Sequence, residues 1–168
     1  MTISAAIVAT QQFLQPLMPA GTKIVRGQAN GVPQPLPPSI VITEVGKPQY
    51  TTTRAKLNSI TGQMTYLQPV QLRLQLDFYG LAAGEMSGIA TTMLRSLYAT
   101  ESFPDGVEPL YCTDGFQAPL TTGEKQYEAR WTMDLFVQYN APVIVGQESF
   151  IHVGEITVDP VDITIPVE

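Results

Sequence analysis

The sequence predicts an α+β fold, with a mixed or mainly antiparallel β-sheet that carries two helices. Apolar and polar residues alternate over 127–139 and again over 70–78, which is typical of strands with one apolar face. In 86–98 the apolar residues recur instead at spacings of three and four, the pattern of an amphipathic helix. At about 3.3 Å per residue the 127–139 segment would span roughly 43 Å, more than twice a common strand. We therefore expect it to serve something larger than the core of its own domain.

The N-terminal segment 5–17 is expected to form an amphipathic helix. Ser4 precedes it as an N-cap, and its apolar residues recur on one side of a helix. Proline cannot continue a helix interior, so the helix should end near Pro16 or Pro19. With one apolar side, this helix should pack on the sheet.

Short strands are expected to follow over 23–27, 40–45 and 51–58, the last two joined by a turn at 47–48. The stretch 28–38 lies between the first two strands and contains four prolines. Proline fixes φ and removes a backbone donor, so this stretch cannot be a central strand. It is expected to be an exposed loop of largely fixed shape.

The second half of the chain begins with the segment 70–78, which is expected to be a central, half-buried strand. The helix after it has Glu85 in its first turn, and its stripe of Met and aromatic residues is expected to lie in the core. The stretch 104–123 is long and rich in Pro, Gly and Thr, which indicates a contact loop. The break at 141–142 should end the last long strand.

The chain is expected to form one domain over 1–145, followed by an extended acidic segment over 146–168. A length of 168 residues with 44% hydrophobic residues suffices for a single core. Apolar residues alternate again over 161–167, where prolines confine a strand to an edge. This edge strand could add to a neighbouring subunit's sheet. A frayed tail, or an edge strand on its own domain, remains an equal alternative.

The net charge of −6 is unevenly distributed. Residues 1–80 contain six basic and two acidic residues, residues 81–140 contain three basic and eight acidic residues, and 141–168 contain five acids and no base. The basic part of one subunit could therefore meet the acidic part of the next and steer head-to-tail association. Pairing of these charges within one molecule is the alternative.

Few features of the sequence support catalysis or ligand chemistry. His152 is the only histidine and has no partner motif, and the single Cys112 has no nearby basic residue in sequence to activate it. No metal-ligand spacing and no glycine-rich phosphate loop occurs, so no catalytic residue, metal or cofactor is expected. No apolar run approaches the ~20 residues of a membrane span. Nine Lys and Arg residues in an acidic chain do not form a patch for sequence-specific DNA binding, whereas a neutral or acidic wall suits a channel through which DNA slides.

Four stretches resemble the neck or tail terminator proteins of contractile-tailed bacteriophages: 25–43, 74–80, 94–100 and 109–143. The most specific piece is GEKQYEARWTMDLFVQYN, over 123–140. The resemblance implies a small domain in which two helices pack on one face of the sheet. It also implies a hexameric ring that caps the tail tube, joins it to the head connector and performs no catalysis.

The resemblance implies partners and places as well. The partners would be other copies of the chain, head-tail connector proteins, tail tube and sheath proteins, and genomic DNA that passes through the lumen without specific binding. The protein would be assembled in the host cytoplasm and reside in the virion, with no membrane involved. Two alternatives stand beside it: another neck or tube component of related fold, and a small enzyme that uses Asp114, Glu124 or His152.

Three groups of residues are assigned roles from the alternating patterns, the charge asymmetry and the resemblance together. The candidate inter-ring contacts are Gln28, Asn30, Val32, Pro35, Asp114, Phe116, Gln117 and Glu124. The candidate subunit contacts are Arg54, Lys56, Arg73, Val161, Ile163 and Ile165. The expected core anchors are Tyr127, Trp131, Leu76, Phe78 and Leu94.

Overall fold

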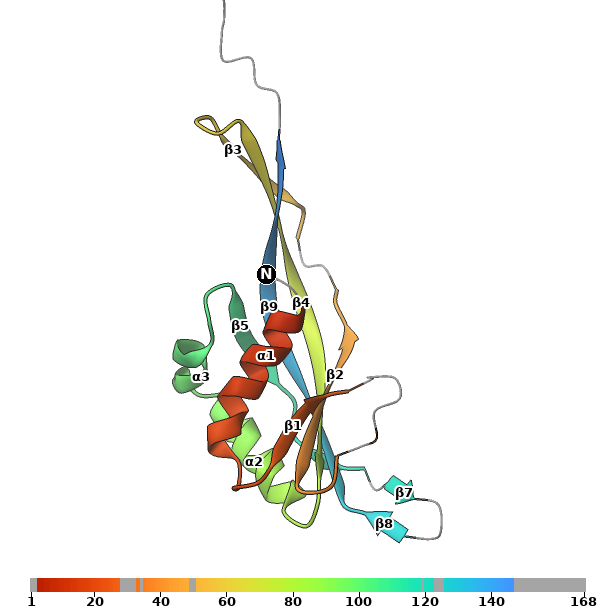
Figure 1. Cartoon of the computed structure of the whole chain (residues 1–168). Helices are drawn as coiled ribbons and strands as arrows, with labels where there is room; N and C mark the ends of the chain where they lie inside the picture. Colours follow the sequence, from red (N-terminus) through yellow and green to blue (C-terminus); the bar gives the residue numbers. More distant parts are fainter. Residues whose placement is uncertain are drawn as a thin grey trace, which may run out of the picture.

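The computed structural model of the protein describes residues 3–27, 33, 35–48, 51–118, 120–122 and 126–146, with the backbone alone for 120–122 and 126–128. A seven-stranded sheet has the order β1-β2-β4-β9-β5, with β3 paired to β4 and β6 paired to β9, and its helices lie against one face (Figure 1). Strands β7 and β8 form a separate two-stranded ribbon. Because β1 and β2 are parallel and the other pairs antiparallel, the predicted α+β fold with a mixed sheet is confirmed.

In chain order the elements are α1 (Ile3–Leu14), η1 (Gln15–Leu17), β1 (Lys23–Arg26), β2 (Ser39–Gly46), β3 (Arg54–Asn58), β4 (Gln63–Tyr79), α2 (Ala83–Leu94), α3 (Leu97–Ser102), β5 (Val107–Cys112), β6 (Phe116–Gln117), β7 (Leu120–Thr122), β8 (Gln126–Glu128) and β9 (Arg130–Gly146). The predicted C-terminal edge strand lies outside the described residues.

The centre of the sheet is the antiparallel pair of β4 and β9, which stay in register over their whole length. Cross-strand partners share one face of a sheet, so the register decides which residues meet. The apolar residues of the two alternating segments lie opposite one another: Leu72 and Val137, Leu74 and Leu135, Leu76 and Met133. All six are fully buried. The two alternations therefore form one continuous apolar face.

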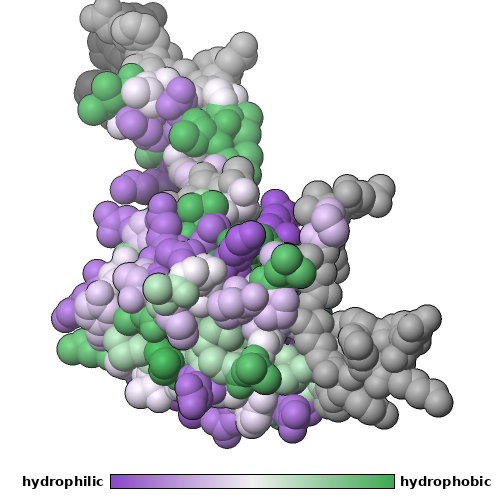
Figure 2. Space-filling view, turned by 60° about the horizontal axis from the view of Figure 1, so that its bottom comes forward, coloured by the Kyte–Doolittle hydropathy of each residue, from purple (hydrophilic) through white to green (hydrophobic). Residues whose placement is uncertain are grey.

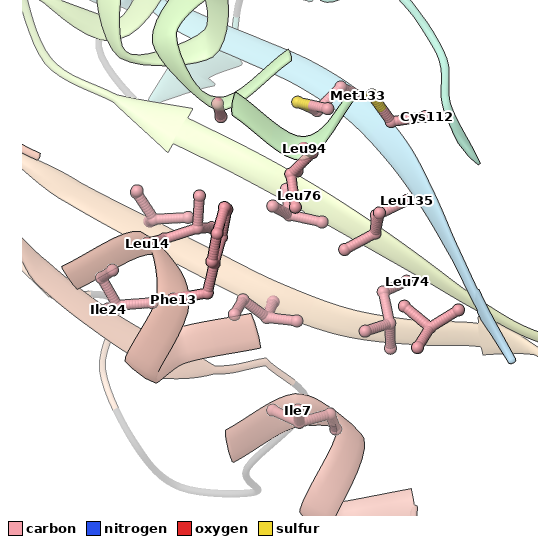
Figure 3. Close-up of a cluster of buried hydrophobic side chains, with 14 of the residues drawn as sticks. Ile7, Phe13, Leu14, Ile24, Leu74, Leu76, Leu94, Cys112, Met133 and Leu135 are labelled. Atoms are coloured by element: carbon pink, nitrogen blue, oxygen red, sulfur yellow. The ribbon is translucent and has the colours of Figure 1, made fainter. Parts of the chain in front are cut away.

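The helices cover this apolar face. Phe13 and Leu14 of α1 point toward the sheet, where Ile24 of β1 and Leu76 of β4 lie (Figure 3). Met86, Ala90 and Leu94 of α2 are buried against the same core. Burying one such aliphatic side chain contributes about 1.5–3 kcal/mol, so the contact between helices and sheet stabilises the body.

The first helix begins earlier than predicted and ends close to Pro16, as predicted. It begins at Ile3, so Ser4 lies inside the helix and is not its N-cap. At the other end the regular helix stops at Leu14, and Gln15–Leu17 tightens into a 3₁₀ turn with Pro16 in it. A proline lacks the N–H that the next α-helical hydrogen bond requires, which accounts for the change of helix type.

The predicted helix over 86–98 is in fact two helices, α2 and α3. Ser96 between them has an extended backbone, and its hydroxyl donates to the Met93 carbonyl at 2.6 Å. A serine that bonds a backbone group in this way competes with continuation of the helix. The consequence is that Leu97 and Tyr98, which were expected in the buried stripe, are 73% and 52% exposed.

The prediction of one long loop over 104–123 is wrong. This stretch contains β5, β6 and β7, and β5 pairs with β9 while burying Val107 and Cys112. Pro109 lies where the ladder shifts register, a position at which a proline is tolerated in a strand. The Pro, Gly and Thr content of the stretch indicated a loop, and composition does not reveal that β5 and β6 pair with a strand distant in sequence.

The long terminal strand also differs from its prediction. Ala129 separates β8 from β9, and β9 continues through Pro142 to Gly146, opposite a β4 that begins at Gln63 and includes Pro69. The amides of Asp134 and Asn140 donate to Thr113 and Gly106, so even-numbered residues of β9 direct their nitrogens away from β4. Pro142 has this parity and lies beyond the last pairing of β5.

Pro69 occupies the matching position in β4. The amide of Gln71, two residues on, donates to the Pro48 carbonyl, away from β9. Pro69 also lies in the gap between the residues that pair with β3 and those that pair with β2. Neither proline therefore breaks a hydrogen bond of the central ladder, and both strands can run on.

Candidate assembly surfaces

The side of β4 and β9 opposite the helices is polar, and we call it the polar face. Its residues are Gln71, Arg73, Gln75 and Asp77 of β4 and Arg130, Thr132, Asp134, Phe136 and Gln138 of β9. The register places the four β4 residues opposite four of the β9 residues and places Arg130 opposite Tyr79, so all of them share one face of the sheet. The alternation thus gives the central sheet one apolar face that forms the core and one face that carries mainly polar side chains.

Asp77 is the centre of a hydrogen-bond network on the polar face. It is 5% exposed, and its Oδ1 accepts hydrogen bonds from Arg130 Nη2 at 2.9 Å and from the Thr132 hydroxyl at 2.7 Å. The Gln75 amide donates to both carboxylate oxygens, at 3.1 and 3.0 Å. A buried carboxylate requires such donors, and here the neighbouring strand supplies the two strongest.

A second cluster on the polar face is aromatic. Arg73 pairs with Asp134 at 2.6 Å, and this bond raises the pKa of the Arg73 guanidinium. The guanidinium lies 5.9 Å from the Phe136 ring centre, and Phe136 stacks on Tyr111 at 4.3 Å. Arg, Tyr and Phe are enriched where proteins contact one another, and Tyr111 is 50% exposed. We call Arg73, Tyr111 and Phe136 the aromatic cluster.

The charges of the two long strands cancel in pairs. Together β4 and β9 contain four charged residues, and these form the two ion pairs just described. The centre of the polar face therefore presents no net charge.

Beyond the helices, β3 and the outer ends of β4 and β9 form a projecting three-stranded ribbon, which we call the arm (Figure 1). It comprises Arg54–Asn58, Gln63 to Pro69 and Asn140 to Gly146. Exposed apolar side chains gather on it (Figure 2), and five of them are Leu57, Tyr66, Val143, Ile144 and Val145.

Neither face of the arm is packed on a core. Val145 lies opposite Met64, which lies opposite Leu57, so these residues share the face that continues the apolar side of the body. Ile144 points to the other face and is 59% exposed. A three-stranded sheet ordinarily buries one apolar face, and exposed apolar patches of this kind mark contact sites. The arm is the main feature that sequence reasoning missed.

A small cleft lies between α2 and the segment that links β5 to β6. It has a volume of about 270 Å³ and is lined by Gly84, Ser87, Gly88, Thr91, Thr92, Asp114, Gly115 and Trp131. The ring of Trp131 packs so close to Gly84 that a β-carbon there would lie 3.1 Å from Cε2. A β-carbon on Gly115 would overlap the Ser87 hydroxyl, which is buried without a hydrogen-bond partner. The linking segment thus contacts α2 closely at Gly115, and β9 contacts α2 closely at Gly84.

The predicted inter-ring contacts fall in two groups. Asp114, Phe116 and Gln117 are exposed at the β5–β6 end of the sheet, and Asp114 pairs with Arg95 at 2.8 Å. Pro35 is half-buried. The other four, Gln28, Asn30, Val32 and Glu124, lie outside the described residues.

The predicted subunit contacts are spread over three places. Arg54 and Lys56 are exposed on the arm, and Arg73 belongs to the aromatic cluster on the polar face. The remaining three, Val161, Ile163 and Ile165, lie outside the described residues.

Of the expected core anchors, Leu76, Phe78 and Leu94 are buried, while Trp131 is half-buried and packs against the edge of the core. The side chain of Tyr127 is outside the described set. Leu76 lies directly opposite Met133, and Phe78 lies opposite Trp131.

Cys112 has a basic neighbour in space that its sequence context did not reveal. The Arg95 guanidinium donates to the Cys112 carbonyl at 2.9 Å. Burial nevertheless dominates and raises the pKa of the Cys112 thiol, so the thiol stays protonated at neutral pH. Over the described part of the chain, no group of three His, Cys, Asp or Glu residues is placed to hold a metal ion. None of the described helices has the length and apolar character needed to cross a membrane.

A family model described as phage neck terminator protein matches residues 4–166. No curated protein matches the chain. Among solved structures, the sheath/tube terminator of an extracellular contractile injection system, PVC, in its extended state has a TM-score of 0.59 at 8% identity. The match covers 96% of this chain but only 65% of that one, and at such low identity the likeness concerns the fold.

Proposed function

Because the chain belongs to the phage neck terminator family, we propose that it forms a hexameric ring that caps the tail tube, joins it to the head connector and leaves a passage for DNA. Its family makes it a structural component of the phage neck or tail. The observation that carries the ring is the arm, whose apolar side chains are exposed on both faces of a thin sheet. Such a ribbon is stable only when something covers it, and in a ring another copy can do so.

The polar face supports the passage for DNA. A wall along which DNA slides should not hold phosphates, and the Arg residues of β4 and β9 are each neutralised by an aspartate. We therefore assign the polar face to the side of the ring that meets the lumen.

Contacts with other neck and tail components are assigned to the β5–β6 end. Asp114, Phe116 and Gln117 are exposed there, and Phe116 is 58% exposed. The similar solved structure is a terminator of both sheath and tube. Contact with sheath proteins is accordingly part of the proposal, as is assembly in the host cytoplasm before incorporation into the virion.

The small-enzyme alternative receives no support from the geometry. Of its three residues, Asp114 is tied to Arg95, while Glu124 and His152 lie outside the described residues. The other alternative, a different neck or tube component of related fold, is separated from a terminator by position in the particle.

Two experiments test the ring and its place. Mass photometry and negative-stain images of the purified chain should show closed hexameric rings. A phage that lacks the gene should produce heads and tubes that do not join, and addition of the purified chain should restore joining. A chain that remains monomeric at every concentration, or is missing from mature particles, contradicts the proposal.

A separate test addresses the passage. Asp134→Asn should free Arg73, so that rings retain a short DNA duplex at low salt and release it as salt rises. The double variant Arg73→Gln/Asp134→Asn is the matched control, because it keeps the loss of Asp134 but carries no free cation. Equal duplex retention by the two variants would show that Arg73 does not face the lumen.

A further inference from the structure

The two faces of the arm differ in charge. Arg54 lies opposite Leu67, which lies opposite Pro142; Lys56 lies opposite Thr65, which lies opposite Ile144. Arg54 and Lys56 therefore share the face that carries Ile144, and both are exposed. The described residues of the arm include no acidic side chain and no ion pair. This face of the arm is both basic and apolar, and we call it the basic face.

A surface of opposite charge lies on the body at α3. Leu97 and Tyr98 are exposed at its start, and Glu101 lies three and four residues further on, which places it beside both on the helix surface. Asp105 follows in the next turn and is also exposed. The ring of Tyr98 is held against Phe13 of α1 at 5.9 Å. These four exposed residues, Leu97, Tyr98, Glu101 and Asp105, form what we call the α3 surface.

The α3 surface has no basic residue of its own to neutralise it. Between Ser96 and Cys112 the sequence contains no Lys or Arg. Arg95, just before α3, is engaged by Asp114 and by the Cys112 carbonyl. Two acids beside two exposed apolar side chains thus match the basic face, which offers two bases beside Ile144 and Leu67.

We propose that the basic face of the arm docks on the α3 surface of a second copy of this chain. This inference rests on the proposed ring and names the surfaces that close it. In Figure 1 the arm projects beyond the helices while α3 lies on the body, so the two surfaces are separate parts of the subunit. A contact between two different surfaces of the same subunit is heterologous, and repeating it generates a ring when the rotation closes. Arg54 and Lys56 set partner and register, and the apolar residues supply the burial.

A charge-swap experiment tests the docking. The arm variant carries Arg54→Glu/Lys56→Glu, and the body variant carries Glu101→Lys/Asp105→Lys. Each alone presents like charges at every contact, so its assembly midpoint concentration should rise about tenfold or more. An equimolar mixture should reassemble. The acidic arm of the arm variant then meets the basic α3 surface of the body variant, and the basic arm of the body variant meets the acidic α3 surface of the arm variant.

The matched control is Lys23→Glu/Arg26→Glu, which changes one Lys and one Arg on β1, both exposed and both outside the arm. This control changes the net charge by the same amount as the arm variant, yet it should assemble like the wild type. Thermal unfolding of each variant under dilute conditions establishes that the body remains folded. Mass photometry over a range of concentration and salt measures assembly.

A second measurement does not depend on the reversed charges. A copy with Lys56→Cys mixed with a copy with Glu101→Cys should be joined by a short bismaleimide into a covalent dimer. Lys23→Cys mixed with Glu101→Cys should not be joined. Cys112 is buried and should contribute little background.

The outcomes separate this inference from the proposed function. If wild-type rings form but the charge variants assemble normally and the Lys56–Glu101 pair is not joined, the docking proposal is wrong and the ring stands. If the wild type never assembles, the ring itself is wrong. A third outcome is that the charge variants assemble like the wild type while removal of residues 160–168 abolishes assembly. In that case the acidic tail rather than α3 covers the arm, and the docking proposal is wrong.

Discussion

Arg130 donates two hydrogen bonds to Oδ1 of Asp77, from Nη2 at 2.9 Å and from Nε at 3.2 Å, across the central strand pair. The two residues are 53 positions apart in sequence, and only the register of β4 with β9 brings them together. Thr132 adds its hydroxyl to the same oxygen. The hydrogen bonds of Asp77, the most buried carboxylate of the polar face, therefore form only when β4 and β9 pair in this register.

Asp77→Ala should destabilise the fold substantially. It leaves the Arg130 guanidinium and the Thr132 hydroxyl without their acceptor on a half-buried surface, for which we expect a loss of about 2–3 kcal/mol. Asp77→Asn keeps the shape and one acceptor oxygen, so it should lose less. Chemical denaturation under dilute conditions measures both. A loss of less than about 0.5 kcal/mol for Asp77→Ala would show that these hydrogen bonds contribute little to stability.

Gly115→Ala should destabilise the contact between α2 and the β5–β6 segment by about 1–3 kcal/mol, because the new methyl group overlaps the Ser87 hydroxyl. Ser87→Ala removes that hydroxyl and leaves no partner unsatisfied, since the hydroxyl has none. The double variant should therefore recover most of the loss. A double-mutant cycle of unfolding free energies measures this coupling, and additive losses would contradict it.

The sequence predicted the body of the sheet better than the arm. From Leu72 to Phe78 and from Trp131 to Tyr139, the apolar residues other than Phe136 keep one parity, because one face of these strands forms the core and the other carries polar side chains. In the arm that difference disappears: Val143, Ile144 and Val145 are all apolar and all exposed. The sequence pattern of a strand reports burial within one subunit, so it does not reveal a strand whose apolar side chains remain exposed in the subunit.

The surface networks were predicted less well, for a different reason. Arg73 was assigned a subunit contact from charge asymmetry alone, whereas its position over Phe136 depends on cross-strand register. The split between α2 and α3 likewise depends on the Ser96 hydroxyl, whose bond to Met93 overrides a continuous helical period. Periodicity identifies faces, but it does not reveal which polar groups find partners.

The stability of the fold should fall at alkaline pH partly through Cys112. Burial raises the pKa of its thiol above the ordinary value of 9.0, so the folded state holds its proton to higher pH than the unfolded state does. The stabilisation is complete below the unfolded pKa and is lost as pH rises through the folded one. As the pH rises above the ordinary thiol pKa of 9.0, Cys112→Ala should therefore lose less stability than the wild type. Parallel pH profiles for the two proteins would show that the thiol is not desolvated.

Removal of residues 160–168 should leave a folded subunit that assembles less readily. The segment lies outside the described residues, but its apolar residues alternate and its charge is purely acidic. An edge strand of this kind can add to a neighbour's sheet through backbone hydrogen bonds, and the described core is built from helices and strands that all lie before residue 147. Thermal unfolding should therefore match the full chain under dilute conditions, while the assembly midpoint rises. A variant with Val161, Ile163 and Ile165 all changed to Ser tests the pairing at constant length. If both variants assemble like the full chain, the tail does not take part in contacts between subunits.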